Sequence, residues 1–279
     1  MVKKLIKYDF MSYLRILLPV QLIVIGVALI NRIIQFFEPP LTKTGYGVDT
    51  GSSAIYNSIF VSSLVLYIIS IAVCLLITVI ISVVRFYRGM YSNEGYLNHT
   101  LPVTASQHIW AKLLTSMLFY LGSLFAVFIS FMIITAGDLN IEIFKAGFYV
   151  LGKAFNSYGA NIALYILEGV ILLLLSVTAM YLKLYCCLSV GQLAKKRKIL
   201  LAFGVFFGIY VVKQIIATVF IASAAVNYVF FESISEWISD NGIAFIHILL
   251  CGSIVFYAVL SLVYFLINKY LMSKKLNLA

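Results

Sequence analysis

Six long apolar stretches, separated by short polar connections, account for most of this chain. They cover about residues 16–37, 58–84, 109–135, 160–190, 199–226 and 243–268. A helix needs about 20 apolar residues to cross the roughly 30 Å of hydrocarbon in a bilayer, and each stretch is long enough. A membrane β-barrel would instead show segments of about ten residues with alternating polarity, which the sequence lacks. The pattern predicts an all-α polytopic membrane protein with six transmembrane helices.

Composition supports this fold class, because 63% of the 279 residues are hydrophobic and only 11% are charged. A typical soluble domain carries about 25% charged residues and could not bury so much apolar surface. The connections are too short for a separate soluble domain, so we expect a single transmembrane domain over residues 1–279. The first apolar stretch is longer than a signal-peptide core and lacks a small-x-small cleavage site, so we expect it to be retained.

Basic residues are concentrated in alternate connections. Of the 20 Lys and Arg residues, 15 lie in segments 1–15, 85–112, 183–198 and 269–279, and only four lie in 32–57, 136–158 and 227–242. Acidic residues show the opposite bias, with two in the first group and seven in the second. Cytoplasmic connections carry the basic excess in membrane proteins, so both termini are predicted to lie in the cytoplasm. The net charge of +10 therefore indicates orientation in a lipid bilayer, and we expect no nucleic-acid partner.

Two connecting segments have the pattern of helices that lie along the membrane surface. Residues 1–15 form a lysine-bearing amphipathic lead-in, and Pro19 is expected to mark its bend into the first span. In the connection before the last span, one helical face carries four apolar residues, Phe231, Ile234, Trp237 and Ile238. This spacing predicts a short extracellular helix with aromatic residues at the headgroup level, and an ordinary connector is the alternative.

The connection between the second and third spans predicts a short rigid element. Ser92 or Asn93 can cap a brief helix that carries Glu94. Pro102 would end this helix, because helical geometry is disfavoured for the residue before a proline. Thr104 and Gln107 have the spacing of a capping box that opens the third span. A short helix held across the cytoplasmic face in this way is suited to receive force from a soluble partner.

This connection resembles the permease subunits of ABC transporters of the second exporter type (ABC type-2), above all small members from Gram-positive bacteria. In that family an EGYL…TLPV…K run follows the second span. The corresponding residues here are Glu94, Gly95, Tyr96, Leu97, Thr100, Leu101, Pro102, Val103 and Lys112. The residue-level match covers about 20 positions, whereas the six-span plan and its accessory helices match over the whole chain.

The resemblance implies a half-transporter in the bacterial cytoplasmic membrane. Two permease chains, either copies or paralogues, would pair around a substrate path, and each would bind an ABC ATPase subunit. The residues implied in ATPase coupling are Asn93, Glu94, Gly95, Tyr96, Leu97, Leu101 and Pro102. ATP and Mg would bind the partner subunit, so no cofactor is expected in this chain.

Small residues mark two faces where helices can approach closely. Ser116, Ser123, Ser130 and Gly137 recur every seven residues along the third span. Gly204 and Gly208 form a small-xxx-small pair in the fifth span. The resemblance places the fifth helix at the dimer seam, which makes these two glycines candidate dimer-packing residues.

Two ionisable residues lie inside predicted spans. Glu168 is in the fourth and Lys213 in the fifth, where a lone charge costs about 2.5–3.5 kcal/mol even on the lenient insertion scale. Their predicted depths differ by only about 6 Å at about 1.5 Å per residue, so a structural ion pair is one explanation. The others are that the two side chains line a water-filled substrate path, or that the lysine reaches toward the surface.

Nothing in the sequence indicates an enzyme. The run GFYVLGKA at 147–154 has the glycines and lysine of a P-loop, but Ala154 stands where magnesium binding needs Ser or Thr. His99, His108 and His247 show no ligand-like or triad spacing. We therefore expect an ATP-driven exporter subunit for an amphipathic or hydrophobic substrate, with a bacteriocin-like or toxin peptide favoured. The alternatives are a stand-alone secondary transporter or channel, and a non-transporting membrane anchor or immunity protein.

Overall fold

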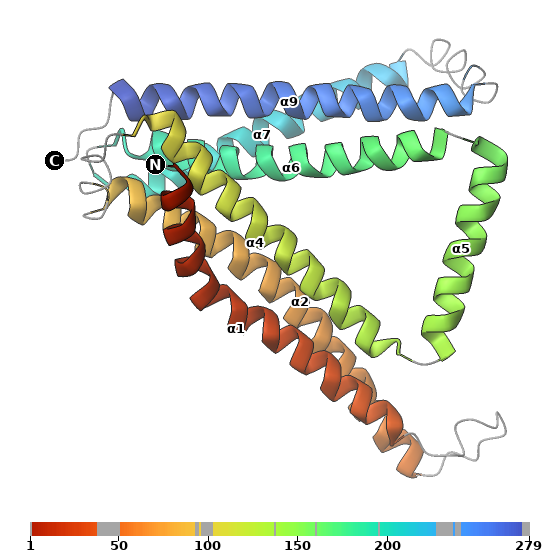
Figure 1. Cartoon of the computed structure of the whole chain (residues 1–279). Coiled ribbons are helices and arrows are strands. Elements are labelled where there is room, and N and C mark those ends of the chain that lie inside the picture. Colours follow the sequence, from red (N-terminus) through yellow and green to blue (C-terminus); the bar gives the residue numbers. More distant parts are fainter. Residues whose placement is uncertain are drawn as a thin grey trace. The chain divides into compact units, whose positions relative to one another are not determined.

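The structure is a computed structural model, and it describes only part of the chain. The described residues are 2–37, 51–92, 95, 103–136, 138–159, 161–194, 196–226, 237 and 241–274. Within these ranges every regular element is an α-helix (Figure 1). The elements are α1 (Val2–Phe36), α2 (Gly51–Tyr91), α4 (Ala105–Ile134), α5 (Asp138–Tyr158), α6 (Asn161–Gly191), α7 (Lys198–Val226) and α9 (Gly242–Lys274).

The prediction of six membrane-crossing helices is confirmed. All of these helices except α5 are long and apolar enough to span a bilayer, with mean hydropathies of 2.2 to 3.1 in their most apolar windows. No more than 22% of any such window is buried inside the chain. Apolar side chains that the chain does not cover need an apolar solvent, so the protein is a multi-pass membrane protein.

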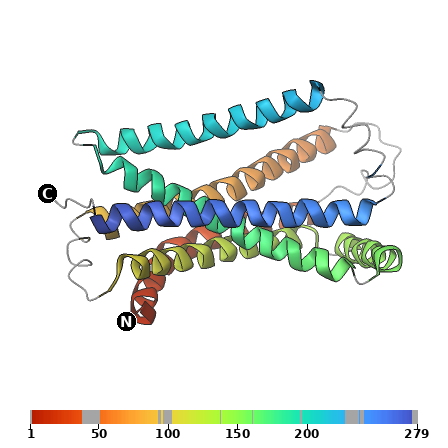
Figure 2. The ribbon, with the colours of Figure 1, turned by 90° about the horizontal axis from the view of Figure 1, so that it is seen from above.

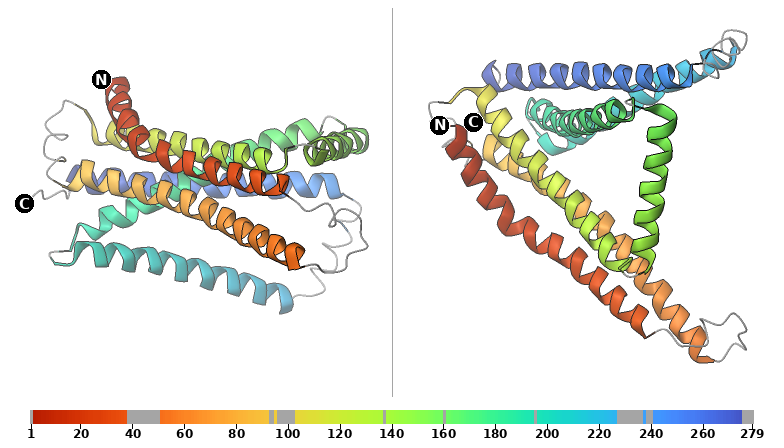
Figure 3. Two further views of the ribbon diagram at one scale, coloured as in Figure 1. Left: turned by 90° about the horizontal axis from the view of Figure 1, so that it is seen from below. Right: turned by 45° about the vertical axis from the view of Figure 1, so that its right-hand side comes forward.

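The N-terminal lead-in is helical but is not a separate element. Residues 2–15 continue directly into the first span as α1, with Pro19 inside the helix. Figure 3 shows this helix curving near its N-terminal end. Tyr13 is fully buried, so the lead-in contributes to the core as well as to the surface. The lead-in is therefore helical and continuous with the span, whereas its position along the cytoplasmic surface stays a prediction.

Two further predicted helices fall largely outside the described residues. One is the short cytoplasmic helix before Pro102, of which only Gly95 is described, and the other is the extracellular helix before the last span. Of the extracellular helix expected before the last span, the structure describes only Trp237 and residues from 241 onward.

One helix was not predicted from the sequence. The segment 136–158 was treated only as a connection between the third and fourth spans, but residues Asp138–Tyr158 form the 21-residue helix α5, which the helical spacing of their apolar residues could have indicated.

By its internal contacts the chain divides into two compact units. The first comprises Met1–Val84 and Leu114–Val150, and the second comprises Arg85–Leu113 and Leu151–Ala279. The last turns of α2 and the first turns of α4 thus belong with α6, α7 and α9. The single domain over residues 1–279 stays a prediction.

A polar seam runs along α4 in the first unit. Ser116, Ser123 and Ser130 are all fully buried, as the seven-residue spacing predicts, whereas Gly137 lies outside the described residues. Their hydrogen-bond partners on α1 and α2 are Tyr13 for Ser116 (3.2 Å), Gln21 and Thr78 for Ser123 (3.1 and 2.9 Å) and Tyr67 for Ser130 (2.9 Å). Small hydroxyl residues let the helices approach and also hold them by hydrogen bonds, so the predicted packing seam is confirmed.

In the second unit α6 is the central helix, because it packs against both α9 and α7. α6 packs along α9 in the view of Figure 1 and crosses it obliquely when seen from above (Figure 2). α6 meets α7 at the turn that joins them, where a Cβ added to Gly191 would lie 2.7 Å from the Ala202 Cβ and 2.8 Å from the Lys198 oxygen. From this turn the two helices diverge (Figure 3). Glycine at this position is therefore what allows the close approach.

Candidate functional site

The connection that joins α2 to α4 is the candidate site for ATPase coupling. Of the residues implied by the resemblance, the structure describes Gly95. The others lie outside the described residues: Asn93, Glu94, Tyr96, Leu97, Leu101 and Pro102. Both ends of the connection are described, and they show how it is held.

Gly95 lies where the chain turns back against the end of α2. Its amide N–H donates to the Ser92 carbonyl at 2.7 Å, and the residue is buried. A Cβ at this position would lie 2.6 Å from the Met90 carbonyl oxygen. That distance is too short for any side chain, and the obstacle is backbone, so the turn requires glycine.

The other end of the connection is fixed by the predicted capping box. The Thr104 N–H donates to Gln107 Oε1 at 3.1 Å, and the Gln107 N–H donates to Thr104 Oγ1 at 3.4 Å. These two bonds satisfy backbone donors at the start of α4, which otherwise lack partners in a helix. The prediction of a capping box is confirmed, and the connection ends on a defined helix start.

The last turns of α2, which carry the connection, are attached to α6. The Tyr91 hydroxyl lies 2.7 Å from the Ser189 hydroxyl. One turn earlier, the Phe86 and Tyr185 rings stack with centroids 3.8 Å apart and planes 7° apart. Phe86 and Tyr185 are fully buried. A hydrogen bond and an aromatic stack at successive turns make this junction stiff.

The attachment continues from α6 to α9 through Asn268. Asn268 Oδ1 accepts a hydrogen bond from the Ser189 hydroxyl at 2.7 Å, and its Nδ2 donates to the Leu182 carbonyl at 3.1 Å and the Tyr264 carbonyl at 2.8 Å. Since Ser189 donates to Asn268, the Tyr91 hydroxyl is the donor to Ser189. Asn268 is fully buried with both ends of its amide paired. We name Tyr91, Ser189 and Asn268 the polar relay.

Sequence analysis missed the polar relay. One available signal was Asn268 itself, because a buried amide in an apolar span is costly unless it has partners. Its partners lie 79 and 86 residues away along the chain, so no local pattern could have named them.

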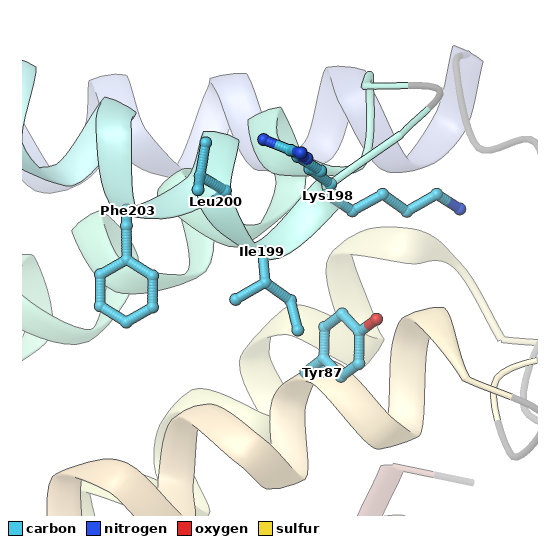
Figure 4. Close-up of a pocket in the computed structure, with 6 residues that line it drawn as sticks. Tyr87, Lys198, Ile199, Leu200 and Phe203 are labelled. Carbon is cyan, nitrogen blue, oxygen red and sulfur yellow. The ribbon is translucent and has the colours of Figure 1, made fainter.

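An open hollow lies beside the last turns of α2 and has a volume of ≈ 640 Å³. Its lining residues are Tyr87, Arg197, Lys198, Ile199, Leu200 and Phe203. Figure 4 shows Tyr87 facing Ile199, with Phe203 on the same side of α7. The hollow thus combines apolar walls with two cationic side chains at the start of α7.

Glu168 contacts His247 and not Lys213. A carboxylate oxygen of Glu168 lies 2.9 Å from His247 Nδ1, and the Cys251 thiol lies 3.7 Å from the same carboxylate oxygen. The Tyr165 ring stacks on the His247 imidazole with centroids 4.2 Å apart. An ion pair with Lys213 was one explanation for the acid, and the structure corrects it, because α6 packs against α9 and brings His247 to the carboxylate.

Lys213 is exposed on α7. It lies near another cation, Lys183 of α6, and the two ammonium groups repel each other. The Lys183 Nζ lies 5.0 Å from the centre of the Phe206 ring, a distance that allows a cation–π interaction. A role for Glu168 and Lys213 in a substrate path stays a prediction.

Gly204 and Gly208, the candidate dimer-packing residues, lie on an open surface. Both are exposed, and a Cβ added at either would meet no atom of this chain within 4 Å. Large apolar side chains on the same helix are also uncovered, among them Phe203 at 71% and Phe207 at 66% exposure. This face of α7 is therefore available to lipid or to another membrane chain. Comparisons with protein-family models, with curated proteins and with solved structures found no match.

Proposed function

We propose that this chain is the membrane-spanning permease subunit of an ATP-driven ABC exporter in a bacterial cytoplasmic membrane. Its substrate is amphipathic or hydrophobic, with a hydrophobic peptide favoured. The observation that carries the proposal is the attachment of the α2–α4 connection to α6 and α9 through the polar relay. The resemblance of residues 94–103 to the type-2 permeases gives that connection its partner, an ABC ATPase subunit.

The mechanism follows from the stiffness of the attachment. A force applied to the connection reaches Tyr91 within a few residues, and Tyr91 is bonded to Ser189 of α6 at 2.7 Å. Ser189 is bonded in turn to Asn268 of α9 at 2.7 Å. Packed helices move as rigid bodies when they are pushed, so closure of a partner ATPase would displace α6 and α9 together. ATP and Mg bind the ATPase. This chain supplies the substrate path and the connection that transmits the movement of the ATPase to α6 and α9.

Two permease chains form the working unit in this proposal. The open face of α7 around Gly204 and Gly208 supports it, since small residues allow close helix contact. The second chain is either a copy of this one or a paralogue.

The test is substrate flux in proteoliposomes that contain the chain with and without its ATPase partner. The proposal predicts export that needs both the ATPase and ATP, and a lower flux per ATP hydrolysed for Tyr91→Phe with an unchanged amount of folded protein. Flux without the ATPase would identify a secondary transporter or channel, which the Glu168–His247 pair in two spans favours as the second candidate. Binding without flux would identify an anchor or immunity protein.

A further inference from the structure

Helix α5 exposes an apolar face that the described chain does not cover. Ile141, Phe144, Phe148 and Phe155 follow the 3, 4 and 7 residue steps that place side chains on one helical face. Their exposed fractions are 53%, 49%, 71% and 49%. A contiguous patch of large apolar side chains is rarely exposed to water, so this face needs an apolar neighbour.

The same helix carries a narrow polar stripe. Glu142, Lys145, Lys153 and Asn156 fall within a sector of about 80° when successive residues are placed about 100° apart around the helix. All four are exposed. Val150 lies on the other flank of the stripe and is 62% exposed, so apolar surface borders the stripe on both sides. A wide apolar face with a thin charged stripe is typical of helices that lie in the plane of a membrane surface.

Connectivity places α5 at such a surface. α4 ends at Ile134 and α5 begins at Asp138, whereas α5 ends at Tyr158 and α6 begins at Asn161. The two or three linking residues reach at most about 10 Å. The first residue of α5 therefore stays near the end of α4, and its last residue stays near the start of α6. Consecutive spans place these two ends on the same side of the bilayer. A 21-residue helix of about 30 Å held at both ends in this way lies along the membrane surface.

We infer that α5 is an interfacial helix that binds the lipid bilayer itself. Its apolar face, centred on Phe144 and Phe148, inserts at the boundary between headgroups and acyl chains. Its polar stripe faces the headgroups and water, where Lys145 and Lys153 extend toward lipid phosphates. Lipid is the occupant because the two tethers keep the helix in the bilayer surface, where acyl chains lie against it. This inference does not depend on the proposed export function.

The test uses single cysteines introduced into the full chain. Membrane vesicles that contain the chain are made permeable, so that a water-soluble maleimide reaches both sides of the bilayer. Matched pairs are Phe148→Cys and Phe155→Cys on the apolar face against Glu142→Cys and Lys153→Cys on the stripe. The parent chain gives the background of its own cysteines. Stripe positions should react about tenfold faster, because an apolar environment suppresses the reactive thiolate. Equal reaction on both faces, or equal protection of both, would overturn the inference.

A second experiment separates lipid from another copy of the chain as the cover. Phe148→Cys is oxidised in the same vesicles, and disulfide-linked dimers are measured on a non-reducing gel. If lipid covers the face, dimer formation should not exceed that of Lys153→Cys. A severalfold excess of dimer at position 148 would show that a second copy covers the face and would refute lipid as its occupant.

Discussion

Replacing Asn268 with leucine tests the polar relay most sharply. Leucine branches at the same atom, is larger and is favourable in an apolar span, so Asn268→Leu removes the amide without leaving a cavity. Any cost of its extra volume is common to both arms of the double-mutant cycle described below and cancels there. Two hydrogen bonds between helices are lost, one from Ser189 and one to the Leu182 carbonyl. The bond to Tyr264 lies within α9 and holds no second helix.

The expected loss in the free energy of unfolding follows from the measured contributions of hydrogen bonds between membrane helices. Each contributes about 0.6 kcal/mol on average and at most about 1.7 kcal/mol, so two give roughly 1 to 3 kcal/mol. Even 1.4 kcal/mol changes the folding equilibrium about tenfold. The Ser189 hydroxyl keeps the Tyr185 carbonyl as an acceptor, and so no buried donor is left unpaired to add to the loss.

The assay is unfolding of the purified protein by titration of dodecyl sulfate into mixed micelles. Trp110 lies 5.6 Å from Phe265 of α9 between ring centres and reports the transition by fluorescence. Ser261→Ala is the matched control, because Ser261 is also buried on α9 but its hydroxyl donates to carbonyls of its own helix. In a double-mutant cycle with Ser189→Ala, we expect a coupling of about 0.6 kcal/mol. The relay would be refuted if Asn268→Leu lowered the free energy of unfolding no more than Ser261→Ala does and the coupling between positions 268 and 189 were zero.

Three further variants test other parts of the structure. Gly191→Ala should destabilise the protein by about 1–3 kcal/mol, because the added Cβ would meet Ala202. The control Gly204→Ala should leave the stability of the monomer unchanged. Equal thermal unfolding temperatures for the two variants would contradict the close α6–α7 turn. Ser123→Leu should cost a similar amount by overfilling the α4 seam, and a chemical unfolding midpoint equal to that of the parent chain would exclude the seam. Lys213→Met should fold normally and reduce transport if the lysine lines the substrate path; unchanged export with normal ATPase stimulation would remove it from the mechanism.

Local and periodic features were predictable from sequence. The six spans follow from runs of apolar residues, and the capping box at Thr104 and Gln107 depends on a three-residue spacing. The buried seam of Ser116, Ser123 and Ser130 follows from a seven-residue repeat. In each case the residues that decide the structure are close together along one helix.

Features that depend on which helices become neighbours were not predictable. Depth in the bilayer suggested Lys213 as a partner for Glu168, but depth does not identify the adjacent helix, and α9 supplies His247 instead. The contact between Tyr91 and Ser189 joins residues 98 positions apart. α5 was not predicted, although its apolar residues already had helical spacing.

The central claim is that a partner ATPase pushes on the α2–α4 connection. The direct measurement is site-specific photo-cross-linking in cells, with a photoreactive amino acid at Leu97 and, as a control, at Phe148 of α5. The proposal predicts that position 97 forms an adduct with an ATP-hydrolysing subunit and that position 148 does not. Adducts of position 97 with lipid alone, or none at all while the protein still exports its substrate, would contradict it.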